Sequence, residues 1–225
     1  MKLSGKIFRL WAFGALVFFS LAIGAYALMF YSSPEGLREQ LFVTEKGAMP
    51  AIWYGILWAH AVSAGIALAI GWLQFVKRLR HRMPSLHRAI GYLYSAAIAI
   101  GGLTGLYLAF YSNGGWSARI GFSVLSILWL YTLYRSLESI IVNRDAAKHG
   151  RWMTYNYALS CAAISLRLYT TLAAIIFGIS DTNESFVVIA WLAWVPNLLL
   201  ARYILGKGGR TNKRPYNNQT KGVIF

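Results

Sequence analysis

Six long apolar segments are the feature that most constrains what this chain can fold into. Each has about the 20 residues that an α-helix needs to cross a bilayer. None shows the alternating pattern of a transmembrane β-strand. The segments are Ile7–Tyr31, Met49–Phe75, Ala89–Tyr111, Ser117–Val142, Met153–Gly178 and Ser185–Leu205. The sequence therefore predicts an all-α fold, a polytopic bundle of about six transmembrane helices.

The composition agrees with a membrane protein. Of the 225 residues, 57% are hydrophobic and only 13% are charged, whereas a soluble domain carries about 25% charged residues. We expect residues 1–206 to form a single transmembrane domain. Residues 207–225 carry Lys, Arg, Asn and Gly without apolar periodicity, which predicts a basic, flexible cytoplasmic tail.

Small residues indicate which segments lie at the centre of the bundle. Helices in lipid approach closely where Gly, Ala and Ser face one another. The second, third and fifth segments carry such stripes, including Gly101 and Gly105 in the third, and we expect these three to be the inner helices. The first segment is rich in Phe and Leu, which predicts a peripheral position.

The distribution of Lys and Arg predicts the orientation of the bundle. Most of the 22 Lys and Arg residues lie in the N-terminal residues, the tail and the connections 76–88 and 143–152. The connections 32–48, 112–116 and 179–184 hold few. Positive loops stay in the cytoplasm, so both termini are predicted to be cytoplasmic, which requires an even number of spans. We therefore expect a multi-pass protein of the cell inner (cytoplasmic) membrane.

The net charge of +15 has the same explanation. In a soluble protein such a charge would suggest nucleic acid as the partner. Here the charges follow the membrane topology, and we expect their partner to be the anionic headgroups of the lipid bilayer, with no nucleic acid. A membrane protein partner is left open.

Four polar residues near the middle of their segments are candidates for a midplane ligand site. They are His60, Thr104, Arg167 and Asn197. A rise of about 1.5 Å per residue places them at a similar depth. Ionisable groups in lipid are costly and usually functional, and Arg167 has no acid at its own depth. Two structural alternatives stay open: backbone carbonyls and water could satisfy Arg167, and an interhelical hydrogen bond could satisfy His60.

A second candidate cluster lies at the predicted cytoplasmic boundary. Its members are His87, Arg88, Glu138, His149 and Arg151. His and Arg precede two helices that run inward, where cations oppose the helix dipole, so phosphate headgroups or a ligand should offset them. Glu138 follows Arg135 by three residues, which predicts an ion pair. The histidines His60, His87 and His149 are the candidate metal ligands.

These motifs resemble a known family. The resemblance is carried, in order along the chain, by His60, His87, Arg88, Gly91, His149, Arg151, Trp152, Met153 and Arg167. This pattern is similar to a bacterial predicted membrane protein family, the domain of unknown function number two thousand three hundred and six. The resemblance implies a membrane protein of six or seven helices and implies no reaction.

Three functions remain open from the sequence. Buried His and Arg with many aromatic residues favour a redox protein associated with haem or quinone, although a haem with two axial histidines would need a second one near His60. A midplane site beside Pro196 favours a small-anion or proton-coupled transporter. A non-catalytic subunit of a membrane complex is the third. Hydrolase and phosphate-loop motifs are absent from the sequence, and whether the protein is an enzyme is left open.

Overall fold

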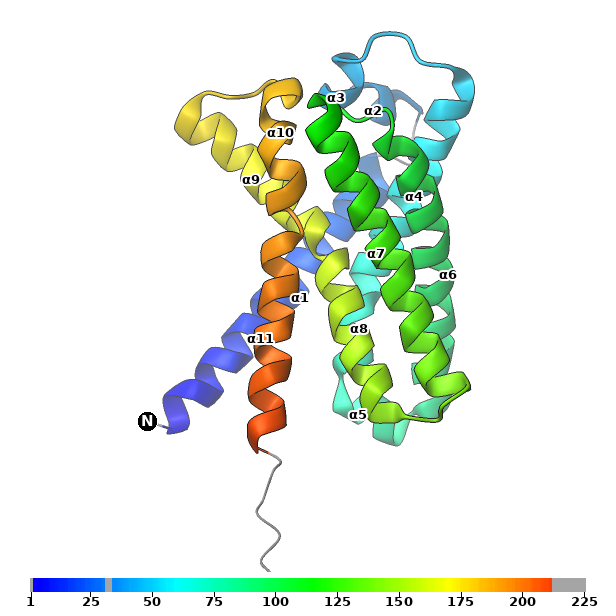
Figure 1. Cartoon of the computed structure of the whole chain (residues 1–225), viewed down its shortest axis with the longest axis vertical. Coiled ribbons are helices and arrows are strands. Elements are labelled where there is room, and N and C mark those ends of the chain that lie inside the picture. Colours follow the sequence, from blue (N-terminus) through cyan, green and yellow to red (C-terminus); the bar gives the residue numbers. More distant parts are fainter. Residues whose placement is uncertain (1, 31–33, 212–225) are drawn as a thin grey trace, which may run out of the picture.

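The chain folds into a bundle of helices that run between two ends of the molecule (Figure 1). The structure is a computed structural model, and it describes residues 2–30 and 34–211. All regular elements in these residues are helical, and six stretches of them are long and apolar enough to cross a membrane. The predicted all-α bundle of about six spans is thus confirmed.

The first four spans are continuous and the last two are broken. The continuous spans are α1 (Lys2–Phe30), α4 (Ala51–Gly71) with its 3₁₀ extension η1 (Trp72–Phe75), α6 (Pro84–Ala109) and α7 (Gly115–Ile141). The broken spans are α8 (Ala146–Ser160) with α9 (Ala162–Phe177), and α10 (Thr182–Leu192) with α11 (Val195–Thr211). Short helices between spans are α2 (Pro34–Arg38), α3 (Leu41–Thr44) and α5 (Lys77–Arg82). Most of the predicted tail, residues 212–225, lies outside the described residues.

The third and fifth spans begin earlier than the sequence predicted. The third starts at Pro84, because proline fits the first turn of a helix, where its missing N–H is not needed. The fifth starts after Asp145, whose carboxylate accepts a hydrogen bond from the Lys148 backbone N–H at 2.9 Å and so caps the helix. The predicted starts were wrong because polar residues in a first turn were assigned to the loops.

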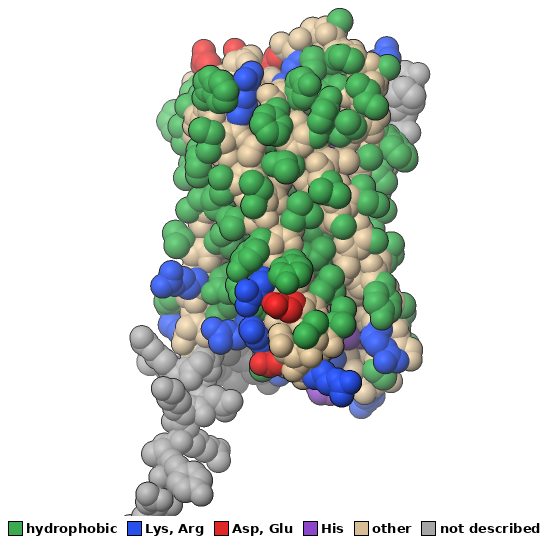
Figure 2. Space-filling view, turned by 45° about the vertical axis from the view of Figure 1, so that its right-hand side comes forward, with side chains coloured by type: hydrophobic (Ala, Val, Ile, Leu, Met, Phe, Trp, Pro, Cys, Tyr) green, Lys and Arg blue, Asp and Glu red, His purple; other side chains and the backbone are tan. Residues whose placement is uncertain are grey.

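The two ends of the bundle differ in charge. The N-terminal end of α1, the helix α5 and the C-terminal end of α11 lie at one end, which we call the basic end (Figure 1). Helices α2 and α3 lie at the opposite end, together with the turn between α9 and α10. On the face drawn in Figure 2, an apolar band separates the ends, and Lys and Arg gather mainly at the basic end. That the basic end faces the cytoplasm stays a prediction.

The inner helices are α4, α6, α7 and α8. The predicted inner position is confirmed for the second and third spans. In the fifth span only α8 is inner. The fourth span, α7, is also an inner helix, which was not predicted. The first span has the smallest buried share of the six, as expected. Gly71 shows how tightly the inner helices pack: a Cβ there would lie 2.5 Å from Tyr157 Cε2 and 2.6 Å from Tyr94 Cε2.

A hydrogen-bonded group of side chains fills the half of the bundle near the basic end. We call it the core network, and it consists of Tyr94, Trp129, Thr132, Asn156 and Ser160. The Tyr94 hydroxyl donates to Asn156 Oδ1 at 2.7 Å, and Asn156 Nδ2 donates to the Trp129 carbonyl at 2.8 Å. Tyr94 and Asn156 are fully buried, so these bonds satisfy polar atoms that neither water nor lipid reaches.

The breaks in the last two spans lie beside each other. The fifth span is interrupted at Cys161 and the sixth at Ala193 and Trp194, just before Pro196, which has no N–H to continue the helix. Asn197 Nδ2 donates to Ser165 Oγ at 3.1 Å and to the Ala193 carbonyl at 3.0 Å. The Asn197 amide therefore joins the two breaks and gives the Ala193 carbonyl, at the break of the sixth span, a hydrogen-bond donor.

Candidate functional site

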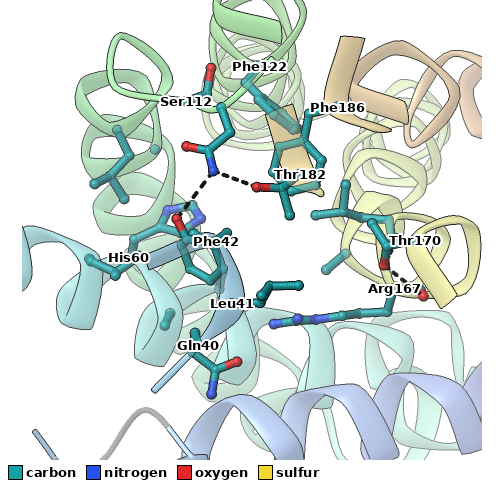
Figure 3. Close-up of a pocket in the computed structure, with 18 of the residues that line it drawn as sticks. Gln40, Leu41, Phe42, His60, Ser112, Phe122, Arg167, Thr170, Thr182 and Phe186 are labelled. Carbon is teal, nitrogen blue, oxygen red and sulfur yellow. Dashed lines mark hydrogen bonds between the residues drawn. The ribbon is translucent and has the colours of Figure 1, made fainter. Parts of the chain in front are cut away.

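A cavity of about 660 Å³ occupies the half of the bundle away from the basic end. Its wall comes from α1, α4, α6, α7, α9 and α10, and α3 covers it with Leu41 and Phe42 (Figure 3). Most of the wall is apolar, and its aromatic side chains include Phe42, Phe122 and Phe186. This size lies within the range of about 300–1,000 Å³ of small-molecule sites.

The His60 imidazole contributes one hydrogen-bond acceptor to this cavity. His60 Nδ1 lies 2.8 Å from the Gly101 carbonyl oxygen, and because a carbonyl only accepts, Nδ1 carries the proton. The Nε2 atom of a neutral ring then has a free lone pair. Nε2 makes no hydrogen bond to any residue that the structure describes. His60 thus offers an acceptor to a bound molecule.

Two glycines of α6 make room for the imidazole. A Cβ on Gly105 would lie 2.9 Å from His60 Cε1 and 3.1 Å from Ser126 Oγ. A Cβ on Gly101 would lie 3.1 Å from the Trp129 ring and 3.2 Å from Ser63 Oγ. The Gly101-x-x-x-Gly105 spacing that predicted helix packing therefore also positions His60 against the α6 backbone.

Arg167 lines the same cavity from α9. Its guanidinium carbon lies 4.9 Å from the centre of the Tyr26 ring of α1, a cation–π contact. The Tyr26 hydroxyl donates to Gln40 Oε1 at 2.8 Å, so α1, α9 and the segment before α3 are connected at this point. Figure 3 shows the Arg167 side chain extended across the cavity towards Leu41 and Gln40. The aromatic face of Tyr26 thus partners Arg167.

The cavity wall is positively charged. Among the described residues, its charged side chains are Lys46 and Arg167, and it contains no carboxylate. Two buried polar atoms of wall residues, Trp53 Nε1 and Ser112 Oγ, have no hydrogen-bond partner within this part of the chain. Buried polar atoms without partners are rare, and a polar group of a bound molecule would satisfy them.

A group of hydrogen-bonded polar side chains, the polar latch, lies at the α3 end of the cavity. We give this name to Glu45, Lys46, Asn113 and Thr182. Lys46 Nζ donates to the Tyr111 carbonyl and to Asn113 Oδ1, and Asn113 Nδ2 donates to Glu45 Oε2 at 3.0 Å. The Thr182 backbone N–H donates to both Glu45 carboxylate oxygens at 3.2 Å. Burial is the main cause that lowers the pKa of Lys46 to about 8; the charge of Arg119 adds to this, and Glu45 opposes it.

The other two residues of the predicted midplane set lie elsewhere. Thr104 Oγ1 donates to the Ile100 and Gly101 carbonyls of its own helix, at 2.6 and 3.2 Å. Asn197 bonds Ser165 and Ala193, as described above. Neither residue belongs to the wall of the cavity as far as the structure describes it. The structure therefore brings His60 and Arg167 together on one cavity, and ligand binding by Thr104 or Asn197 stays a prediction.

In the predicted cluster at the basic end, His87 and His149 lie within electrostatic reach of each other, and ligand binding by the cluster stays a prediction. Glu138 Oε2 lies 3.1 Å from Arg135 Nε, which confirms the predicted ion pair. His149 Nδ1 lies 2.9 Å from Ser136 Oγ and 3.0 Å from the Ser136 carbonyl, which fixes its ring on α7. The Gln74 amide approaches the His87 carbonyl at 3.5 Å. Arg88 and Arg151 are exposed, as suits contact with headgroups.

A haem or metal finds few ligands in this arrangement. In residues 2–30 and 34–211, no three side chains of His, Cys, Asp or Glu lie close enough to hold a metal ion. The described cavity wall offers one histidine, His60, whereas His87 begins α6 and His149 lies in α8, both towards the basic end. The donor set around the cavity therefore fits an organic ligand better than a haem with two axial histidines.

Several residues of the site were missed from the sequence. Tyr26 contacts Arg167 and Gln40 bonds Tyr26, and the latch residues Lys46, Asn113 and Thr182 line the cavity. Most lie in the connections, where hydropathy carries no information on which side chains meet. One signal was present: Lys46 is among the few cations on the side of the chain that the charge rule makes poor in Lys and Arg.

Comparison with known proteins supports the family resemblance. A protein-family model with the description "Predicted membrane protein (DUF2306)" matches residues 57–205, which include His60 and Arg167. No curated protein and no solved structure matches the chain significantly.

Proposed function

Because the chain belongs to the DUF2306 family of predicted membrane proteins, whose description names no activity, we propose a function from the cavity. The protein binds a membrane quinone or quinol, an amphiphile with an oxygen-bearing ring, between His60 and Arg167. The observation that carries this proposal is the presence of one acceptor, His60 Nε2, and one cationic donor, Arg167, on the wall of a mostly apolar cavity.

The two polar groups select the chemistry of the ligand. A fatty-acid carboxylate would satisfy Arg167 but has no donor for the His60 lone pair. A quinol hydroxyl donates to Nε2, and a quinone or semiquinone oxygen accepts from the Arg167 guanidinium. The aromatic side chains Phe42, Phe122 and Phe186 offer ring contacts for a flat head group. Both redox forms of one ligand therefore find a partner in the same cavity.

Binding of decylubiquinone to the purified protein in nanodiscs tests this proposal. The ligand should quench tryptophan fluorescence, since Trp53 lines the cavity. We expect His60→Leu and Arg167→Leu each to weaken binding by about tenfold, the effect of one charge-assisted or buried hydrogen bond. Ser95→Ala is the matched control, because the Ser95 hydroxyl bonds the Gly91 carbonyl of its own helix. Unchanged affinity in both cavity variants, with the fold intact, would overturn the proposal.

Transport is a second candidate function, supported by the two broken spans. Transporters place substrates beside interrupted helices at the midplane, and here the breaks at Cys161 and Ala193–Trp194 lie beside each other. Positive charge in the cavity would attract a small anion. Uptake of a radiolabelled anion such as acetate into proteoliposomes, compared between the intact chain and Arg167→Leu, distinguishes transport from binding of a quinone.

A further inference from the structure

Helix α9 is held less firmly than the other walls of the cavity. Its buried residues are Ala162 and Ile164, both in its first turn, whereas Ile175 and Phe177 near its end are 75% and 72% exposed. Its neighbour α10 is anchored on α7: Ser117 Oγ donates to the Val187 carbonyl at 2.7 Å, and the Phe122 and Phe186 rings meet at 5.6 Å. The hairpin of α9 and α10 thus has one fixed and one loosely held helix.

The regular helix is interrupted at both ends of α9, although Cys161 stays in the right-handed helical region and keeps its hydrogen bonds to Tyr157 and Ser165. At its start, Cys161 interrupts the fifth span, and α9 leans away from the direction of α8 (Figure 1). At its end, Gly178 adopts a left-handed conformation with φ +67°, which glycine reaches without strain. Hinge motions in proteins are absorbed by a few residues at such element ends. A rotation of α9 relative to α8 and α10 would be absorbed at these two positions.

Helices α9 and α1 pack directly against each other, and a cation–π contact joins them. In this contact the Arg167 guanidinium lies over the Tyr26 ring at 4.9 Å. Both helices line the cavity here, α1 with Ile23, Tyr26 and Ala27, and α9 with Leu166, Arg167 and Thr170. Separation of the two helices would open the cavity sideways, at the depth of the apolar band.

We propose that α9 is a lateral gate, hinged at Cys161 and Gly178 and held shut by Arg167 on Tyr26, through which the ligand enters from the lipid. This inference rests on the proposed function, because a ligand dissolved in the bilayer needs a route from the side. The polar latch Glu45–Lys46–Asn113–Thr182 keeps the aqueous end of the cavity covered during this movement. Arg167 thus has two roles: it closes the gate and, once the gate has admitted a ligand, binds it.

Labelling of a cysteine inside the cavity tests the gate without any quinone. Ser126 is buried and lines the cavity, so Ser126→Cys reports access once the native cysteine is removed by Cys161→Ala. Tyr26→Leu should raise the rate of labelling by lipid-soluble N-pyrenylmaleimide about tenfold, the effect of losing a desolvated cation–π contact. Tyr26→Phe is the matched variant, since it retains the ring, and its rate should stay near that of the parent.

A disulfide at the hinge provides the opposite test. Ser165 and Asn197 side chains are hydrogen-bonded at 3.1 Å, so Ser165→Cys with Asn197→Cys should allow a bond that pins the base of α9 to α11. Labelling of the reporter should slow at least fivefold on oxidation and recover on reduction. The proposal is overturned if Tyr26→Leu and the disulfide leave the rate unchanged. It is also overturned if a water-soluble methanethiosulfonate gains as much access as the lipid-soluble reagent.

The two proposals fail separately in these experiments. If the labelling rate responds to the gate variants but decylubiquinone does not bind, the gate proposal stands and the quinone proposal fails. If decylubiquinone binds but the labelling rate is the same in all gate variants, the quinone proposal stands and the gate proposal fails.

Discussion

The two halves of the bundle differ in how their buried polar side chains are hydrogen-bonded. One half lies near the basic end and holds the core network, and the other holds the cavity. Both place polar side chains inside an apolar bundle. In the core network, every polar side-chain atom that a hydrogen bond can satisfy finds a partner, as Asn156 does with Tyr94, Trp129 and Thr132. Around the cavity, His60 Nε2, Trp53 Nε1 and Ser112 Oγ find none among the described residues. The satisfied polar groups of the core network specify the fold, whereas the unpaired atoms around the cavity are positions to which a polar group of a ligand or a water would bond.

The largest expected effect separates the two halves by stability. Asn156→Leu removes the acceptor of the Tyr94 hydroxyl, which retains Ser160, and the side-chain donor to the Trp129 carbonyl, and should lower the free energy of unfolding by about 3 kcal/mol. His60→Leu should change it by less than about 1 kcal/mol, because the ring faces a cavity. Unfolding in sodium dodecyl sulfate, followed by circular dichroism, measures both. Asn143→Leu is the control, since Asn143 is exposed. Equal losses at Asn156 and His60 would contradict the distinction between the halves.

Glycine substitutions give a second, smaller contrast. Gly71→Ala presses a methyl group against Tyr94 and Tyr157, which sit in a packed interior, and should cost about 2 kcal/mol of stability. Gly105→Ala pushes the His60 ring into open space, so it should cost little stability and weaken decylubiquinone binding about tenfold. A Cβ on Gly55 meets nothing within 4 Å, so Gly55→Ala is the control for both measurements. Loss of binding without displacement of His60 would point to another site.

The smallest effect concerns pH and the polar latch. The pKa of Lys46 falls from 10.5 to about 8 on folding. The unfolded chain therefore binds more protons than the folded chain between these values, and stability should rise with pH through this window. Because Lys46 is only half-buried, solvent screens the effect, and we expect a shift in thermal midpoint of at most about 2 °C between pH about 7.5 and about 9.5. Lys46→Met should lack this rise, whereas Lys148→Met, at the basic end, should retain it.

The spans could be predicted from the sequence because lipid imposes one strong rule, that apolar helices of sufficient length cross it. This rule does not predict where a helix is interrupted within a span. Pro196 offers a local reason for the break in the sixth span, but Cys161 carries no local signal for the break in the fifth. The same limitation hid the outward position of α9, which has an apolar sequence suited equally to a core or to lipid.

The candidate site could be predicted only in part, because the sequence gives the depth of a residue in a span but not the direction of its side chain. The number of residues from the span ends placed His60 and Arg167 at a similar depth, because the rise per residue is fixed along a helix. It could not give their rotation about the helix axes, which decides that both face the cavity while Thr104 bonds its own helix. Tyr26 looked like an ordinary aromatic of the first span, and only the approach of α1 to α9 makes it the partner of Arg167.

The adjoining breaks in the last two spans also bear on how the protein is made. A sixth span released alone into hydrocarbon would keep the bond from Asn197 Nδ2 to its own Ala193 carbonyl, but Asn197 would lose its partner Ser165 and leave its Oδ1 unsatisfied, at a cost of about 1–3 kcal/mol. The Ser165 hydroxyl on the preceding span meets part of that cost. We therefore expect the translocon to retain the fifth span until the sixth has emerged and to release the two as a hairpin. Biogenesis of this bundle then ends with a paired insertion, and a nascent chain that stops after the fifth span should stay bound to the insertion machinery.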